Sequence, residues 1–541
     1  MATSVRYVPR QLGNAPRRRG RVLWAILGLL LAVVVAVAAV AILWSGATLA
    51  TDSRALARVD LQPFAGKLVS ATASAPDGSA IPLVRHGVRL TPQRLVAPGE
   101  TVSIDVIIRR PSWSGWALGK ERRERLTVRT PVAHVTHRWV SAASGEPPRI
   151  MFDEPIDAIA FGSRNRHPAD GRFFTVPARA PAGSIRVAAA ARSWERVGAP
   201  VRVSWFPPAR RPVALATPAP SSTVAPTSPL RLTFSRPIDE ALGSQTPKLE
   251  PATPGRWRRV DSHTLAFQPS GFGARMGSTL SVKLPHRMAV ATATGRGLRE
   301  TDRIRWTVRR ASILRLQQLL AVAGYLPVKW TPRGADVART PTAQAEAAVE
   351  PPHGSFRWRY HDTPRELRRL WKPGHVNEIT RGAVMMFQDN HHLTVDAIAG
   401  PDVWKALLAD TLGQKRRDKG YSYVYVHRQV PQMLTLWHSG HVVLRSPGNT
   451  GVPAAPTELG TFPVFEHIPV GTMSGTNPDG SHYRDPGIKW ISYFHGGEAL
   501  HAFPRGSFGT PQSLGCVELP LGAAKKVWPY TPIGTLVTIE N

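Results

Sequence analysis

The sequence contains a single cysteine, Cys516, among its 541 residues. One cysteine cannot form an intramolecular disulfide, so the chain is not a small secreted scaffold stapled by disulfides. Each domain must therefore be held together by its own hydrophobic core. A lone thiol is either a small buried apolar side chain or a reactive group, and Cys516 is the one candidate for thiol chemistry.

Acidic residues are also scarce, with 37 Asp and Glu against 69 Lys and Arg, for a net charge of +32 at pH 7. Such a balance favours anionic surroundings, which include nucleic acid, lipid headgroups and anionic wall polymers. The chain is too long for one ordinary core, and its length predicts about three to five domains.

One long apolar run is present, residues 22–44, and it is long enough to span a bilayer as a helix. The preceding tail, residues 1–21, contains six arginines and no acidic residue. The positive-inside rule therefore predicts a cytoplasmic N-terminus, a single-pass plasma-membrane helix and an extracytoplasmic remainder, where nucleic acid is not an expected partner. The alternative is a cleaved signal peptide with a site near residues 48–50, but the apolar run is longer than a usual signal segment.

Residues 51–308 contain short alternating runs separated by turn signals, which indicate β-sandwich modules. An internal repeat supports them, because residues 149–157 correspond to 231–239 at an offset of 82 residues. We expect a β-sandwich region over 51–206, a stiff Pro-rich linker over 207–229 and a second sandwich over 230–308. The region resembles bacterial immunoglobulin-like wall domains, which implies a spacer between membrane and wall.

From about residue 311 the apolar residues recur at the spacing of a helix rather than of a strand. Helices are expected near residues 313, 380 and 401. Residues 311–410 resemble a peptidoglycan-binding-like three-helix domain, interrupted by a polar insertion at 328–378. The resemblance depends on mostly core and capping positions, namely Leu316, Gln317, Gly324, Tyr325, Thr380, Phe387, Gln388, Asp396, Gly400, Pro401 and Trp404. A wall-domain fold without a working binding groove is the alternative.

A basic linker, residues 414–420, precedes a second β-rich region. Strands are expected at 421–426, 432–437 and 441–444, with a hairpin turn at 438–440. A further hairpin joins 489–494 to 499–503, which places His501 on a strand shortly before Cys516. This mostly-β domain should extend over residues 420–541.

The chemistry of this segment follows from its residue types. A thiol with an ordinary pKa is mostly protonated at neutral pH, so a nucleophilic Cys516 needs a neighbouring base. His501 lies 15 residues earlier, and the turn-forming residues between them permit the chain to fold back. Gly515 frees the backbone to direct N–H groups at a developing oxyanion. The three residues together indicate acyl transfer.

Residues 420–541 resemble the L,D-transpeptidase catalytic domain, the YkuD family, in an ordered set of features. These are Tyr425, Val426, Gln432, Leu436, Thr450, Gly451, residues 457–462, Leu500, His501, residues 513–517 and the closing strand 534–539. The resemblance implies that Cys516 attacks the peptide bond before the terminal D-Ala of a tetrapeptide stem and forms a thioester. An amine of a neighbouring stem then resolves it into a 3→3 cross-link.

The same resemblance implies roles for the surrounding residues. His501 would be the base, oriented by an adjacent backbone carbonyl, and the N–H groups of Leu514, Gly515 and Cys516 would form the oxyanion site. No metal or cofactor is required. The acyl-enzyme chemistry also implies covalent inactivation by carbapenems.

Two positions depart from the family pattern, which has His where this chain has Leu514 and Arg where it has Glu518. Leu514 retains its backbone N–H, whereas Glu518 reverses a charge near the site. Ser513 keeps the family residue, with a role in packing or hydrogen bonding. The segment 493–495 supplies further candidates for the donor cleft, Tyr493, Phe494 and His495, although an aromatic pair on a strand is also typical of a core.

Three alternatives stay open at the level of sequence. Water in place of an amine would make the same site an L,D-carboxypeptidase. A zinc peptidase would use some of the 18 histidines, but His438 and His441 flank a predicted turn and no recognisable ligand set accompanies them. A non-catalytic wall tether would leave the terminal domain as a relic.

Overall fold

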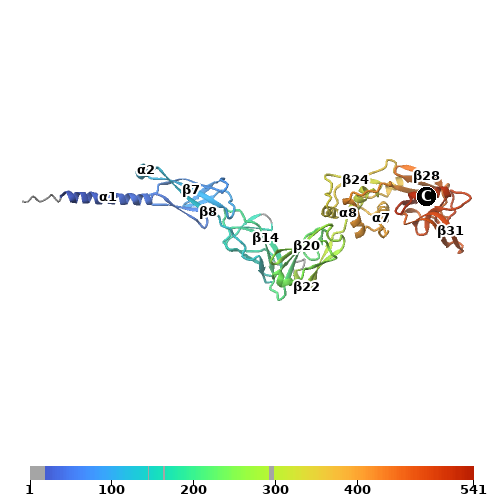
Figure 1. Cartoon of the computed structure of the whole chain (residues 1–541), viewed down its shortest axis with the longest axis horizontal. Helices are drawn as coiled ribbons and strands as arrows, with labels where there is room; N and C mark the ends of the chain where they lie inside the picture. The colour runs from blue at the N-terminus through green and yellow to red at the C-terminus, as the bar shows by residue number, and fades with distance from the viewer. Residues whose placement is uncertain (1–18, 144, 163–164, 179, 292–297) are drawn as a thin grey trace, which may run out of the picture. The chain divides into compact units, whose positions relative to one another are not determined.

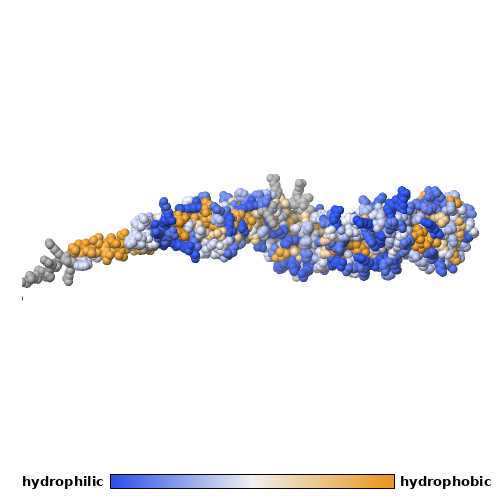
Figure 2. Space-filling view, turned by 90° about the horizontal axis from the view of Figure 1, so that it is seen from above, coloured by the Kyte–Doolittle hydropathy of each residue, from blue (hydrophilic) through white to orange (hydrophobic). Residues whose placement is uncertain are grey.

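The computed structural model describes residues 19–143, 145–162, 165–178, 180–291 and 298–541, in two compact units, Met1–Pro208 and Ala209–Asn541 (Figure 1). The first described element is helix α1 (Arg19–Leu43), and Val22–Leu43 is long and apolar enough to cross a membrane. Only 6% of its most apolar stretch is buried, and its surface is hydrophobic (Figure 2). The helix predicted at this position is confirmed.

The first β module follows α1 directly and consists of two four-stranded sheets around one core. Alternate residues of β7, from Val102 to Ile108, are fully buried, as the period of a strand requires. One sheet has the order β1 (Ala47–Ala50), β2 (Ala57–Leu61), β6 (Arg89–Pro92), β5 (Leu83–His86). The other has the order β4 (Ala80–Ile81), β3 (Lys67–Ser74), β7 (Thr101–Arg109), β8 (Glu121–Arg129), with α2 (Ser112–Leu118) between β7 and β8.

A second β module completes the first unit, and the predicted sandwich region therefore contains two cores. A five-stranded sheet has the order β12 (Arg166–Pro168), β11 (Ala158–Phe161), β14 (Gly183–Ala190), β15 (Val201–Phe206), β9 (Trp139–Ser141). A two-stranded sheet of β10 (Arg149–Met151) and β13 (Phe173–Thr175) shares its core.

The third β module opens the second unit and is one eight-stranded sheet around its own core. Its main order is β17 (Thr223–Val224), β23 (Leu298–Val308), β22 (Thr279–Ala291), β16 (Val213–Thr217), β18 (Leu230–Phe234), β21 (Thr264–Pro269), β20 (Gly255–Asp261). Strand β19 (Lys248–Glu250) pairs with β22, and α3 (Ile238–Leu242) follows β18.

The expectation of an extended linker at 207–229 is wrong, because this segment contributes β16 and β17 to the sheet. Backbone pairing with β18, β22 and β23 outweighs the local proline content. The internal repeat, in contrast, is matched by equivalent burial. Phe152 and Phe234 are both buried, as are Ile156 and Ile238.

The helical module contains α4 (Ile313–Val322), α7 (Glu378–Asn390) and α8 (Pro401–Leu412) at the predicted positions. Asn377 caps α7 by accepting a hydrogen bond from the Thr380 backbone N–H at 3.0 Å, and the Gln317 amide donates to the Thr380 hydroxyl at 2.9 Å. The insertion is itself ordered into β24 (Val328–Pro332), α5 (Pro341–Val349), β25 (Gly354–Trp358) and α6 (Arg365–Arg369).

The C-terminal domain consists of two sheets. The first has the order β28 (His441–Pro447), β27 (Met433–His438), β26 (Ser422–His427), β34 (Leu536–Glu540), β29 (Gly460–Pro463). The second has the order β30 (Glu466–Thr476), β31 (His482–His495), β32 (Glu498–Ala502), β33 (Val517–Leu519), and α9 (Leu521–Val527) and the 3-10 turn η1 (Trp528–Tyr530) follow it. The hairpin predicted at 438–440 is confirmed, with positive φ at Ser439 and Gly440.

The helical module and the C-terminal domain share one core. Tyr423, Trp437 and Leu536 of the β domain belong to the same buried cluster as Leu320 and Phe387 of the helices. Gly382 of α7 lies so close to the loop before β34 that an added Cβ would be 2.4 Å from the Gly534 carbonyl oxygen. The helices therefore support the β domain directly.

Candidate active site

His501 and Cys516 are brought together by the parallel pairing of β32 with β33. Leu500 is paired with Val517, and His501 with Glu518, so Cys516 immediately precedes the residue opposite Leu500. A parallel pair requires a crossover connection, which residues 503–516 supply. The turn-forming residues thus let the chain loop back and run alongside β32, as expected.

The His501 imidazole is buried, with 2% of its surface exposed, and its Nδ1 lies 3.0 Å from the Ala502 carbonyl oxygen. A carbonyl can only accept, so Nδ1 carries the proton and Nε2 keeps its lone pair. Burial lowers the pKa of His501 below its ordinary value, since the charged form is desolvated. The residue is therefore a neutral, oriented base at neutral pH.

The Cys516 thiol is only partly accessible, and its Sγ lies 3.7 Å from the Gly497 carbonyl oxygen. Burial raises the pKa of Cys516 to about 12, while a hydrogen bond from the Ala499 backbone acts in the opposite direction. The nearby carboxylates of Glu518 and Glu498 raise the pKa further. The resting thiol is protonated, so attack requires proton removal by a neighbouring group.

The turn before Cys516 is held from two sides. The buried Ser513 hydroxyl donates to the Cys516 carbonyl oxygen at 2.5 Å. Gly515 has φ of +106°, and a Cβ at this position would lie 3.1 Å from a carboxylate oxygen of Glu498. Glu498 in turn accepts the Glu458 backbone N–H at 3.0 Å. The Ser513 hydrogen bond closes the turn that contains Leu514, Gly515 and Cys516, whose N–H groups are the predicted oxyanion donors.

The charge reversal at Glu518 is compensated by an arginine that sequence reasoning did not single out. Arg505 donates through Nε and Nη2 to the two carboxylate oxygens of Glu518, each at 2.7 Å. Glu518 is 4% exposed, and the guanidinium also lies 4.6 Å from the Phe503 ring centroid. The sequence shows an arginine in the short loop between His501 and Cys516, but its pairing with Glu518 is visible only in the folded structure.

The three candidates at 493–495 have different environments, because successive residues of a strand face opposite sides. Tyr493 packs in the cluster that includes Cys516, and burial together with Cys516 raises the pKa of its phenol. Phe494 is 3% exposed in the core beside Phe462, so its assignment to the donor cleft is wrong. His495 lies at the hairpin turn, against Phe462 and 3.5 Å from Glu498.

A cavity of about 580 Å³ lies at the end of β32, lined by Ala502 and Arg505 but not by His501 or Cys516 themselves. Its lining includes Ile488 and Phe503, both of the cluster that contacts Cys516. The Phe503 ring stands edge-on to His501 at 6.0 Å, and Arg505 forms another part of the wall. The volume is in the range of small-ligand sites and fits part of a peptide.

Over the residues that the structure describes, no three His, Cys, Asp or Glu side chains are grouped so as to hold a metal ion. His438 packs against Tyr530 and hydrogen-bonds Ser422 at 3.0 Å, while His441 is exposed at the start of β28.

Residues 421–539 match the YkuD family, the L,D-transpeptidase catalytic domain. Similar solved structures include an L,D-transpeptidase from Mycobacterium smegmatis, with 13% identity, 60% of this chain and 97% of that chain covered, and a TM-score of 0.21. L,D-transpeptidase 3 from Mycobacterium tuberculosis has 12% identity, the same coverages and the same TM-score. The catalytic domain of the E. faecium L,D-transpeptidase has 24% identity over 23% of this chain and 100% of that chain, also with a TM-score of 0.21. No curated protein matches the chain.

Proposed function

Since residues 421–539 form a YkuD L,D-transpeptidase catalytic domain, we propose that the protein is a membrane-anchored, extracytoplasmic enzyme that makes 3→3 peptidoglycan cross-links. The observation that carries the proposal is the geometry of His501. Its Nδ1 is held by the Ala502 carbonyl, and its strand places it beside the residues that follow Cys516. This is the arrangement of a base that serves a cysteine nucleophile.

The proposed reaction has two halves. His501 Nε2 takes the Cys516 proton as Sγ attacks the carbonyl carbon before the terminal D-Ala of a tetrapeptide stem. The N–H groups of Leu514, Gly515 and Cys516 stabilise the oxyanion, and His501 returns the proton to the leaving D-Ala amine. An amine of a second stem then attacks the thioester carbon and loses its proton through His501. The new amide bond forms and the thiol is released.

Proton transfer must accompany attack rather than precede it. Burial raises the pKa of the Cys516 thiol, so the free enzyme keeps it protonated at pH 7. The lowered pKa of His501 likewise disfavours a resting thiolate–imidazolium pair. Base catalysis at the moment of attack avoids a buried ion pair in the free enzyme.

The anchor is supported by the structure that follows α1. Residues 48–50, the alternative cleavage site, belong to β1 and are paired with β2 from Ala47 opposite Leu61 to Ala50 opposite Arg58. Cleavage near residues 48–50 would remove part of β1 and Ala47, which belongs to the buried core of the first module. We therefore propose an uncleaved helix with its arginine-rich end in the cytoplasm.

The test is to incubate the full-length protein, in detergent, with a disaccharide tetrapeptide and to identify the products by mass. Cross-linked dimers are the expected product. Free tripeptide alone would make the protein an L,D-carboxypeptidase, since water resolves the same thioester. A Cys516→Ala variant that cross-links as well as the native protein would leave only a wall tether.

The acyl-enzyme can be trapped independently of the acceptor. Solved structures similar to this chain include an L,D-transpeptidase in complex with imipenem and a catalytic domain acylated by ertapenem. We expect each drug to add its mass to Cys516 and to leave the Cys516→Ala protein unmodified. A thiol alkylating agent should abolish cross-linking, and loss of activity to a chelator alone would contradict the mechanism.

A further inference from the structure

A second cavity, of about 270 Å³, lies in the helical module and is remote in sequence from the catalytic residues. We call it the insertion pocket. Its lining includes Arg315 of α4, Trp330, Arg339 and Gln344 of the insertion, and Lys415 and Arg416 of the basic linker. The insertion and the linker are the two segments that the catalytic domain leaves unexplained, and here they enclose one space.

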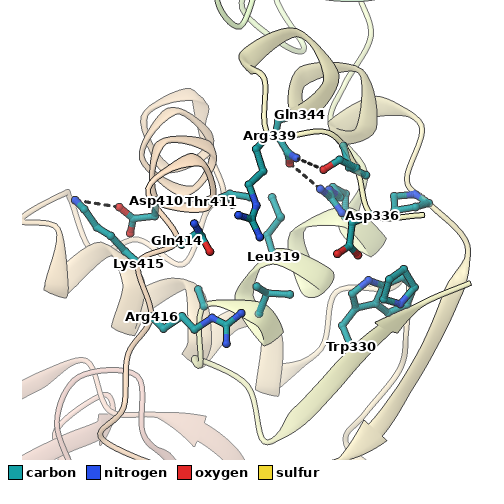
Figure 3. A pocket seen from close by; sticks show the side chains of 16 residues that line it. Leu319, Trp330, Asp336, Arg339, Gln344, Asp410, Thr411, Gln414, Lys415 and Arg416 are labelled. Carbon is teal, nitrogen blue, oxygen red and sulfur yellow. Dashed lines mark hydrogen bonds and ion pairs between the residues drawn. The ribbon is translucent and has the colours of Figure 1, made fainter. Parts of the chain in front are cut away.

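The pocket is rich in positive charge. Four cationic side chains line it, Arg315, Arg339, Lys415 and Arg416, against two carboxylates, Asp336 and Asp410. Asp410 and Lys415 pair with each other at 3.4 Å, and the His391 ring also lies 2.7 Å from Asp410, so the pocket retains three guanidinium groups against the carboxylate of Asp336. Figure 3 shows the guanidinium groups of Arg339 and Arg416 reaching into the same space from opposite sides of Leu319.

Arg315 is a buried cation, with 5% of its surface exposed. Its guanidinium donates to two neutral acceptors, the amide oxygens of Gln318 at 3.1 Å and Gln344 at 2.8 Å, and its buried Nε has no partner in the described chain. A buried charge is costly without an opposite charge nearby. An anion in the pocket would provide one.

The walls of the pocket are rigid. Gln344 donates to the Ala338 carbonyl at 3.0 Å and Gln318 to the Pro352 carbonyl at 2.9 Å, so both amides are fixed to the insertion. The linker is pressed against the end of α4, where a Cβ on Gly324 would lie 2.3 Å from the Arg417 carbonyl oxygen. A site held in this way loses little entropy when it binds a ligand.

From this arrangement we propose that the insertion pocket binds an anionic sugar unit of the cell wall, a ring bearing a phosphate or a carboxylate. Guanidinium groups match the paired oxygens of both anions. The half-buried Trp330 offers an apolar wall on which a sugar ring packs, and the exposed Gln414 offers an amide for hydroxyl groups. The volume is near the lower limit of small-ligand sites and suits one such unit. The site would hold the neighbouring catalytic domain against the wall.

Binding is tested with the full-length chain in detergent, by calorimetry or ligand-observed NMR, using glucose 6-phosphate, glucuronate and neutral glucose as probes. We expect one or both charged sugars to bind and glucose not to bind. Arg339→Gln and Arg416→Gln, both at exposed positions, should each weaken binding about tenfold, the effect of one lost charge-assisted contact. Arg333→Gln is the matched control, because it removes an exposed charge of the same insertion outside the pocket lining.

The choice of probes distinguishes the two possible anions. Preference for the phosphate sugar identifies a phosphate-bearing wall polymer as the source, and preference for glucuronate identifies a carboxylate-bearing glycan. Glucose binding as tightly as the charged sugars, no binding of any probe, or equal binding by Arg339→Gln and Arg333→Gln would overturn the proposal. The Arg315 network would then only attach the insertion to α4. Cross-linking of soluble tetrapeptide should be unchanged in Arg339→Gln, so failure of this site and failure of the catalytic proposal are distinguishable.

Discussion

The Glu518 carboxylate accepts two hydrogen bonds of 2.7 Å from the Arg505 guanidinium, and Glu518 is paired with His501 across strands β33 and β32. The pair explains how the chain accepts a carboxylate where the family has a guanidinium. The guanidinium that neutralises this carboxylate comes from the loop between His501 and Cys516 rather than from β33. Arg505 also donates to the Gln512 carbonyl at 3.1 Å, so the pair ties that loop to the strand.

Removing Arg505 should reduce the free energy of unfolding more than removing the charge of Glu518. Arg505→Gln leaves the buried Glu518 carboxylate without its partner and should destabilise the domain by about 3 kcal/mol. Glu518→Gln alone should cost less, because Arg505 is partly exposed and can reach water. The double variant should be more stable than Arg505→Gln. Thermal unfolding of the three proteins measures the coupling, and strictly additive losses would mean that the two groups do not interact.

The pH profile of cross-linking should report His501 as the base. Because burial lowers the pKa of His501, the neutral form is present at neutral pH and activity should fall only below about pH 6.5, its ordinary value. The Glu518 and Asp485 carboxylates raise this pKa and Arg505 lowers it, both less than burial does. With the thiol pKa near 12, no second break should appear up to about pH 10.

The lowered pKa of His501 should also make the free energy of unfolding depend on pH. A histidine whose folded pKa is depressed binds fewer protons in the folded state than in the unfolded chain, so stability should be lost as pH falls from 6.5 through the folded pKa of His501. A His501→Gln protein should lack this part of the acid transition.

For the activity profile, an acid limb that lies above pH 6.5 would show that a group other than His501 is the base.

Gly515 should tolerate no side chain. Gly515→Ala places a Cβ on a residue with φ of +106° and 3.1 Å from Glu498, which costs on the order of 1–3 kcal/mol and turns the N–H groups of the predicted oxyanion site. We expect kcat to fall by about a hundredfold, since one misplaced donor costs that much. Gly506→Ala, in the same loop with open space around it, is the control. Equal activity of the two variants would refute the role of this turn.

The contact between the helical module and the catalytic domain should be required for stability. Gly382→Ala would bring a Cβ to 2.4 Å from the Gly534 carbonyl oxygen, and a packed core absorbs such an intrusion at a cost of about 1–3 kcal/mol. The Tm of the second unit should fall, whereas Gly522→Ala, in α9 with nothing near its Cβ, should leave the Tm unchanged or raise it slightly, because Ala is the better helix former. No difference between them would argue against a shared core.

Local patterns were sufficient for much of the architecture. The apolar run predicted α1, the alternation of apolar residues predicted β7, and the Ser439 and Gly440 turn predicted the hairpin of β27 and β28. Such features depend on neighbours in sequence, so they can be read one segment at a time. The order of motifs around His501 and Cys516 likewise identified the catalytic domain that the family match supports.

Other assignments failed because they depend on partners distant in sequence. The proline-rich segment 207–229 became part of a sheet through pairing with β18, β22 and β23. Phe494 was expected in the cleft and lies in the core, since which face of β31 points inward is decided by the layers on each side. Arg505 was overlooked, because nothing near it in the sequence announces a bond to Glu518.

The amino-acid sequence by itself determined the parts of this protein: an apolar helix long enough to cross a membrane, β modules, a helical module and a last domain with one thiol and a histidine 15 residues before it. Only the tertiary structure decided their environments. It buried Cys516 and His501 so that both are uncharged at rest, paired Glu518 with Arg505, and joined the insertion to the basic linker around Arg315. The physical reason is that burial and electrostatic partnership depend on distance in space, which sequence spacing does not specify.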